Sequence, residues 1–80
     1  MGGIYTYAYN ILGMAFYKMN INNKAIESFQ KAILLKNDCS DAYYNLAIVL
    51  NKIGNKTESR KLFEKSSKIK QPIDDDFNNP

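Results

Sequence analysis

The sequence contains no histidine and only one cysteine among its 80 residues, and these absences narrow the chemistry open to the chain. Histidine is the side chain that most often acts as a general base, so the commonest catalytic group is missing. The lone Cys39 cannot form an internal disulfide, and nothing has the spacing of a zinc site. No glycine-rich phosphate loop is present, because Gly2 and Gly3 precede no strand. We therefore expect no enzyme activity, no cofactor and no bound metal.

Charge is missing from the start of the chain, where no charged side chain precedes Lys18. The uncharged stretch 4–17 is too short to span a bilayer and lacks the basic leader of a secretion signal. The formal net charge of +3 is modest, and the basic run 52–70 is followed by three aspartates at 74–76. This pattern does not indicate a nucleic-acid surface. We expect an intracellular, cytoplasmic protein that binds neither membrane nor nucleic acid, and the lone cysteine fits a reducing compartment.

The chain repeats itself without a gap when Tyr9 is laid on Tyr43. In this alignment bulky residues fall on bulky residues, and small residues fall on small ones. The matched positions are Tyr9, Leu12, Gly13, Phe16, Ala25, Phe29 and Ala32 in the first copy and Tyr43, Leu46, Ala47, Leu50, Ser59, Phe63 and Ser66 in the second. A period of about 34 residues with this alternation is typical of tetratricopeptide repeats. The chain resembles that family over residues 6–72, and we expect the matched side chains to pack the helices together.

Two departures from the family pattern are mild. Tyr9 stands where tryptophan is usual, and the usual closing proline is Asn37 in the first copy and one residue late, at Pro72, in the second. The resemblance implies an all-α fold of two tandem helix-turn-helix hairpins, which together make four helices and a short right-handed α-solenoid. It also implies a non-catalytic module that binds a peptide or protein partner.

Hydrophobic periodicity predicts the same four helices without the family. Apolar residues recur at spacings of three and four over residues 5–19, 23–36, 40–53 and 57–69. Asn20 and Gly54 tolerate a left-handed backbone and are expected to turn the chain within each hairpin. We expect Asp38 to cap the third helix and Asn55 the fourth. Gly13, inside a helix, indicates a close helix crossing, because glycine there costs about 1 kcal/mol relative to alanine.

These boundaries give a domain organisation. Residues 1–4 are read as start residues or an expression remnant, 5–37 as the first repeat, 38–70 as the second, and 71–80 as a flexible acidic tail. The last helix is more polar than its counterpart, which is typical of the solvent face of a terminal repeat. The exchanges that carry this interpretation replace Ile26 by Arg60, Ile33 by Ser67, Leu34 by Lys68 and Ala25 by Ser59.

The first helix shows the opposite pattern, because apolar residues cover almost every side of it. Repeats of this kind usually need three or more copies for stability. We therefore expect either that upstream repeats are missing or that the chain forms a homo-oligomer through this helix. The second possibility is the alternative function, a structural element that assembles with itself.

In the resembled family the first helix of each hairpin lines a groove that takes a peptide. Carried over by position, the groove residues are Tyr7, Asn10, Ile11, Met14, Tyr17, Lys18, Tyr44, Asn45, Ile48, Asn51 and Lys52. Tyrosines supply contact area at low entropy cost, and amides can bond to a peptide backbone. For Tyr9 and Tyr43 core packing is the preferred interpretation, whereas for Tyr7, Tyr17 and Tyr44 groove and core stay open.

Two other partners fit the sequence less well. Family members that bind the carboxylate tail of heat-shock chaperones use a lysine and an asparagine in the first repeat, where this chain has Asn10 and Met14, and only Asn45 matches. RNA binding by a related helical-repeat family is suggested by basic residues of the last helix. These are Lys56, Arg60, Lys61, Lys65, Lys68 and Lys70. They lie away from the inferred groove, so a solvated face explains them better.

Overall fold

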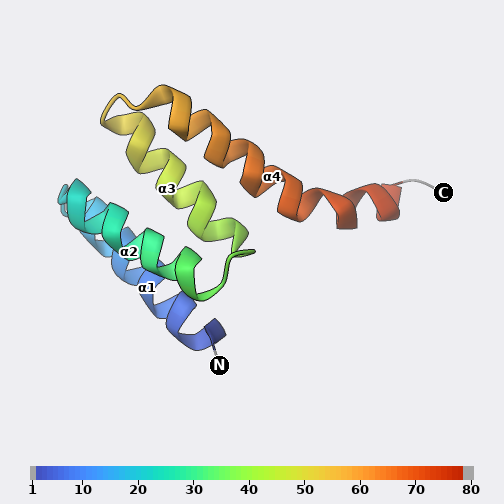
Figure 1. Ribbon diagram of the computed structural model, residues 1–80, viewed down its shortest axis with the longest axis horizontal. Helices are drawn as coiled ribbons and strands as arrows, with labels where there is room; N and C mark the ends of the chain where they lie inside the picture. The colour runs from blue at the N-terminus through green and yellow to red at the C-terminus, as the bar shows by residue number, and fades with distance from the viewer. Residues whose placement is uncertain (1, 79–80) are drawn as a thin grey trace.

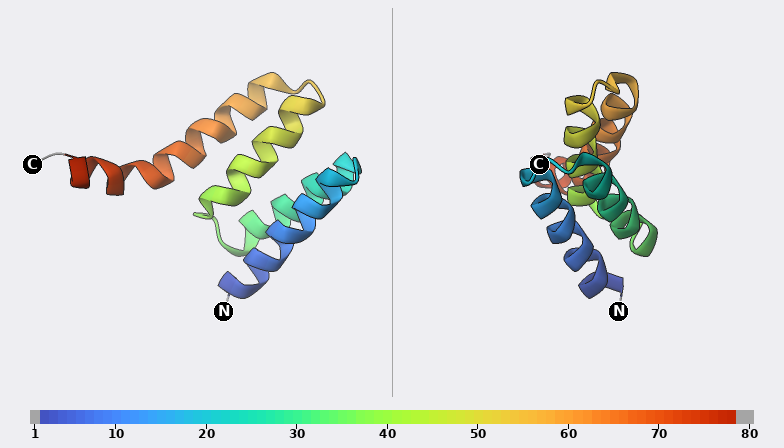
Figure 2. Two further views of the ribbon diagram at one scale, coloured as in Figure 1. Left: turned by 180° about the vertical axis from the view of Figure 1, so that it is seen from behind. Right: turned by 90° about the vertical axis from the view of Figure 1, so that its left-hand side faces the viewer.

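The chain forms two antiparallel helical hairpins, stacked one on the other. The computed structural model describes the backbone of residues 2–78 and, within it, the side chains of residues 3–69. Its helices are α1 (Gly2–Lys18), α2 (Asn22–Leu35), α3 (Ser40–Lys52) and α4 (Lys56–Asn78), and residues 2–78 contain no strand. α2 packs on α3 and joins the hairpins, so α1 lies at one end of the stack and α4 at the other (Figures 1 and 2). The predicted all-α fold is confirmed, and seven of the eight helix ends agree with the prediction to within three residues.

Both hairpin turns use the same backbone device, at matched positions of the two repeats. Asn20 has a φ of 64° and Gly54 a φ of 95°, so each adopts the left-handed conformation expected for it. The next residue donates its N–H back into the preceding helix: Ile21 to the Phe16 carbonyl at 2.9 Å, and Asn55 to the Leu50 carbonyl at 2.8 Å. This bond satisfies a carbonyl that the helix end would otherwise leave free.

The interior forms where small residues let helices approach each other. Ala25, Ala32 and Ala47 have no exposed surface, and the Phe29 ring of α2 lies directly against Gly13 of α1. At Gly13, where we expected a close helix crossing, the Phe29 ring occupies the space that a side chain at position 13 would take. The core cluster contains Ala25, Phe29, Leu46, Val49 and Leu50, with Phe16, Tyr17, Ile26, Ile33 and Leu62 packed against it. Because these residues come from all four helices, both hairpins share one core.

A hydroxyl at the start of each hairpin ties its first helix to its second. Thr6 of α1 donates to the Ala32 carbonyl at 3.4 Å, and Ser40 of α3 donates to the Ser66 carbonyl at 3.0 Å. The two donors are one repeat apart, and so are the two acceptors. This repeated contact was missed in the sequence, although the alignment that revealed the repeat also places Thr6 on Ser40.

α4 is longer than predicted. The helix continues to Asn78, so its predicted end at Ile69 is wrong, while the flexibility expected for the tail 71–80 stays a prediction and 79–80 lie outside the described residues. Pro72 removes one helical hydrogen bond, and a proline can bend a helix without ending it. The last part of α4 changes direction and extends beyond the other helices (Figures 1 and 2).

Two further local expectations are wrong. The sequence places Ser59 both among the matched packing residues and on the polar outer face; Ser59 is buried and its hydroxyl donates to the Ala47 carbonyl at 2.7 Å, so only the outer-face expectation is wrong. Asp38 was expected to cap α3, but the residue before that helix is Cys39, which makes no side-chain cap bond. Asp38 instead pairs with Lys36. The other substituted positions of α4, at Arg60, Ser67 and Lys68, are exposed as expected.

Candidate functional site

One face of the stack carries a hollow between the first helices of the two hairpins. It has a volume of about 200 Å³ and is bordered by α1, α2 and α3. Its lining residues are Met14, Tyr17, Lys18, Phe29, Asn45 and Ile48. Five of these belong to the predicted groove set, and Phe29 of α2 is the addition. We call this lining the groove hollow.

An amide pair lies beside the groove hollow. Asn45 of α3 donates its side-chain N–H to Oδ1 of Asn10 on α1 at 3.0 Å. Asn10 is only 8% exposed, so it lies mostly below the surface, whereas Asn45 is half-buried and borders the hollow. The pair links the two hairpins directly and fixes one amide at the edge of an apolar hollow.

A lysine closes the other side of this face. The Lys52 ammonium lies 4.8 Å from the centre of the Tyr17 ring and donates to Oδ1 of Asn20 at 2.7 Å. Both contacts cross from the second hairpin to the first. Lys52 therefore holds Tyr17 in place beside the hollow by a cation–π contact, while Lys18 stays exposed at its edge.

The remaining predicted groove residues are spread more widely. Tyr44 packs edge-on against Phe63 of α4 with ring centres 5.3 Å apart, and it borders a separate hollow between α3 and α4. Asn51 accepts a hydrogen bond from Lys56 at 3.1 Å near the α3–α4 turn. Tyr7 and Ile11 are exposed on α1. Five residues of the predicted groove set thus line one hollow, whereas Tyr7, Ile11, Tyr44 and Asn51 lie outside it.

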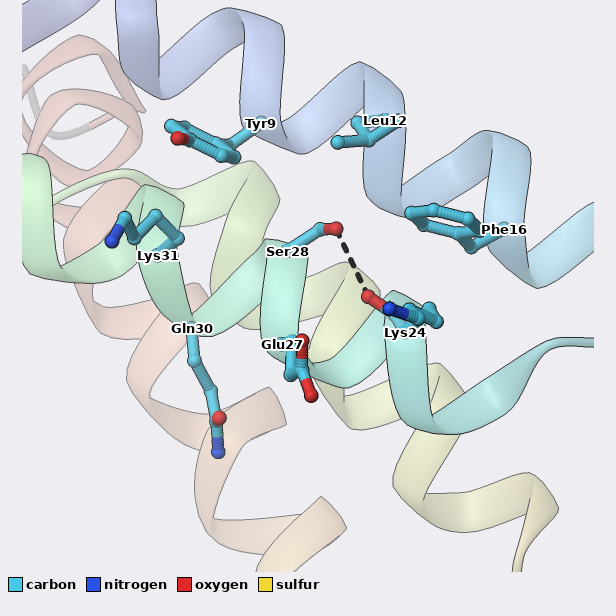
Figure 3. Close-up of a pocket in the computed structure, with 8 residues that line it drawn as sticks. All are labelled: Tyr9, Leu12, Phe16, Lys24, Glu27, Ser28, Gln30 and Lys31. Carbon is cyan, nitrogen blue, oxygen red and sulfur yellow. Dashed lines mark hydrogen bonds between the residues drawn. The ribbon is translucent and has the colours of Figure 1, made fainter.

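The far side of α1 carries a cleft of about 510 Å³, with apolar side chains on α1 and polar ones on α2, which we call the outer cleft. In Figure 3, Tyr9, Leu12 and Phe16 lie in a row along α1, facing the side of α2 that bears Lys24 and Ser28. The full lining is Tyr9, Leu12, Phe16, Lys24, Glu27, Ser28, Gln30 and Lys31.

The outer cleft corrects one expectation about packing. Leu12 was expected to be buried, but it is 43% exposed, whereas its counterpart Leu46 is 5% exposed. The reason is that α2 covers the matching face of α3, and in the described chain no helix covers this face of α1. Tyr43 is buried and donates its hydroxyl to the Asn37 carbonyl at 2.8 Å, while Tyr9 is only half-buried.

The electrostatics of the face with the groove hollow come from its lysines. Among the described residues, no group of three or more metal-binding side chains is close enough to hold a metal ion. The side chains with shifted pKa values, Lys36 and Asp38, lie on the turn between the hairpins. There a 2.5 Å hydrogen bond lowers the pKa of Asp38 and raises that of Lys36. Both of these side chains are exposed, and neither borders the groove hollow.

Stacked hairpins with a repeat of about 34 residues define a class of helical-repeat proteins. A model of the TPR repeat matches residues 13–54, and a model of the tetratricopeptide repeat matches residues 40–72. The chain belongs to the tetratricopeptide repeat family, whose repeats are in general scaffolds for protein interaction. No curated protein matches the chain. Between residues 2 and 78, no helix combines the length and apolar character needed to cross a membrane.

Proposed function

We propose that the face between α1 and α3 binds an extended segment of a protein partner, with one apolar side chain of that segment in the groove hollow. The observation that carries this proposal is the hollow's composition. Met14, Tyr17 and Ile48 offer apolar surface around a volume that suits a single large side chain. Filling it would remove apolar surface of both molecules from water, which is the main source of affinity at such sites.

The polar groups around the hollow support an extended backbone. Asn45 gives one side-chain N–H to Asn10, and its amide has a second N–H and a carbonyl oxygen to offer a peptide group. Because the Asn10 bond fixes its orientation, Asn45 loses little side-chain entropy when a peptide binds. In this proposal Asn10 supports Asn45 from below and does not itself contact the partner.

Charge favours an acidic residue beside the apolar one. Lys18 borders the hollow, and Lys52 lies next to Tyr17 at its side. A carboxylate at this edge would meet the Lys18 ammonium, and the Lys52 charge beside Tyr17 adds to the attraction, which weakens as salt rises. The proposed ligand is therefore a segment with a large aliphatic or aromatic residue followed or preceded by Asp or Glu.

The test is selection of a random peptide display library on the full chain, followed by anisotropy titration of the enriched peptides. We expect sequences that pair an apolar residue with an acidic one. Ile48→Glu should weaken their binding by at least about 10-fold, because it places a charge against an apolar side chain. Leu34→Glu is the matched control, since Leu34 lies on α2 outside the groove hollow and is 79% exposed. If Ile48→Glu and Leu34→Glu bind the peptides equally well, the groove hollow is not the binding site.

A further inference from the structure

We propose that two copies of this chain pair through the outer side of α1 in a closed, two-fold dimer. The contact surface is the α1 seam, which we define as Tyr5, Tyr9, Leu12 and Phe16 of α1 together with Met19, the first residue after the helix. These residues follow one another at intervals of four, three, four and three, which is the spacing of a helix that packs along another helix. The proposal concerns a different face of α1 from the groove hollow and does not depend on the proposed function.

Much of the α1 seam is exposed to solvent. Tyr5 is 61% exposed and Leu12 43%, Met19 is also exposed, and Tyr9 and Phe16 are half-buried. The adjacent outer cleft adds open volume, because Ser28 stands there where the second repeat has Leu62. Contiguous exposed apolar surface of this kind marks an interaction site.

The molecule itself shows what kind of partner this surface takes. In the second repeat the equivalent side chains, Tyr43, Leu46 and Leu50, are buried, and the element packed on α3 there is the helix α2. α2 contributes Ile26, Phe29 and Ile33 to the core that includes Leu46 and Leu50. The α1 seam carries the same kind of side chains at the same positions, so its natural occupant is an apolar helix face.

A head-to-tail chain of copies does not supply that face. In such an arrangement α4 of one copy would cover α1 of the next, as α2 covers α3. α4 carries Arg60 and Ser67 where α2 carries Ile26 and Ile33, and both are exposed. Burying Arg60 against the apolar side chains of the seam would cost its solvation. An open filament is therefore disfavoured.

The α1 seam of a second copy does supply it. The seam is apolar along its whole length and no charged residue precedes Lys18, so two seams brought together by a two-fold axis confront no like charges there. The rim of the outer cleft carries positive charge on Lys24 and Lys31 and negative charge on Glu27. Because both signs are present, the rims of two copies can attract each other when they meet. A self-complementary patch of this type closes at two subunits.

Pairing through the α1 seam leaves the groove hollow free. At 100° per residue, Met14 and Lys18 lie on the side of α1 opposite Leu12 and Phe16. A dimer would hence present two groove hollows facing away from the two-fold axis. Two linked sites bind a bivalent partner more tightly than either site alone.

The first experiment measures mass against concentration for the full chain by sedimentation equilibrium. The mass should rise from 9.2 kDa toward twice that value across the micromolar range. Leu12→Glu should raise the dimer dissociation constant at least about 100-fold, because it places a charge in the apolar contact. Leu34→Glu, at an exposed leucine of α2 outside the seam, should leave the constant unchanged. Circular dichroism checks that both variants keep their helices.

The second experiment keeps the proposal testable if Leu12→Glu fails to fold. Leu12 is the central residue of the seam, so Leu12→Cys in a Cys39→Ser background should form a disulfide between copies under mild oxidation. Leu34→Cys in the same background is the control and should cross-link far more slowly. A monomer at high micromolar concentration, equal cross-linking at both positions, or growth beyond two subunits would each overturn the two-fold dimer.

Discussion

Gly13 of α1 packs so closely against Phe29 of α2 that a β-carbon on Gly13 would lie 2.5 Å from Cε1 of the ring. Phe29 is almost fully buried, and the open space that its side chain borders is the groove hollow. Alanine at position 13 should gain about 1 kcal/mol in helix propensity. The strain of overpacking, typically about 1–3 kcal/mol, opposes that gain.

We therefore predict that Gly13→Ala lowers the free energy of unfolding, by up to about 2 kcal/mol, against the trend of helix propensity. Urea unfolding followed by circular dichroism measures the change. Gly3→Ala is the matched control, because Gly3 also lies in α1 but has open space around its Cα. It should be neutral or slightly stabilising. A Gly13→Ala protein more stable than the parent would show that Phe29 can move aside.

The two hairpin turns give a second prediction. Gly54 has a φ of 95°, which is strained for any residue with a side chain, so Gly54→Ala should destabilise the fold by about 1 kcal/mol. Asn20→Gly at the equivalent turn should be close to neutral, because glycine relaxes the left-handed backbone while the hydrogen bond from Lys52 is lost. Thermal unfolding of both variants tests the pair, and a larger loss for Asn20→Gly would contradict it.

The parts of the fold that the sequence predicted depend on local signals. The helix ends beside Asn20 and Gly54 could be placed because each residue favours the backbone conformation that the turn requires. The end of α4 could not be placed, since Pro72 is compatible with either a stop or a bend. Two signals disagreed about Ser59, because the repeat alignment placed it among the packing residues and its polarity placed it on the outer face. The structure favours burial, since the Ala47 carbonyl is within reach of its hydroxyl.

The candidate site was predictable only in part. Position in the repeat identified Met14, Tyr17 and Ile48, which the structure brings together in one hollow. It did not identify Phe29, because that side chain reaches the hollow only through the space beside Gly13. Position also suggested burial for Leu12, whose exposure depends on which helix lies next to it and not on its own repeat. Contacts between repeats are beyond what one repeat's pattern can predict.

The turn between the hairpins predicts a small pH dependence. The Lys36 ammonium lowers the pKa of Asp38 below its usual 3.8 through their hydrogen bond. Its stabilising contribution is present above the unfolded-state pKa of Asp38 and is lost as the pH falls through the lower folded-state pKa. Both side chains are exposed to solvent, so the effect is screened and small.

Accordingly, Asp38→Asn should lower the Tm at pH 7 by no more than a few degrees. The difference from the parent should disappear in acid, once Asp38 is protonated in both states, and should shrink in high salt. Glu64→Gln, which removes one exposed negative charge from α4, controls for net charge. A difference that persists unchanged at low pH would mean that position 38 acts through something other than its charge.

The hydrogen bond between Asn10 and Asn45 predicts coupling between the hairpins. Asn10 is nearly buried, so Asn45→Ala leaves its amide oxygen without this donor, at a cost of about 1–2 kcal/mol. Asn10→Ala removes the acceptor and leaves Asn45, which borders the hollow, free to turn toward water.

The double variant, with both asparagines changed to alanine, should lose less stability than the sum of the two single losses, with a coupling energy of about 0.5–1 kcal/mol. Asn51→Ala, whose partner Lys56 is exposed, should change stability by less than about 0.5 kcal/mol. Strict additivity in the cycle would mean that the hairpins are held together by the apolar core alone, and that Asn45 is not held in place at the edge of the hollow.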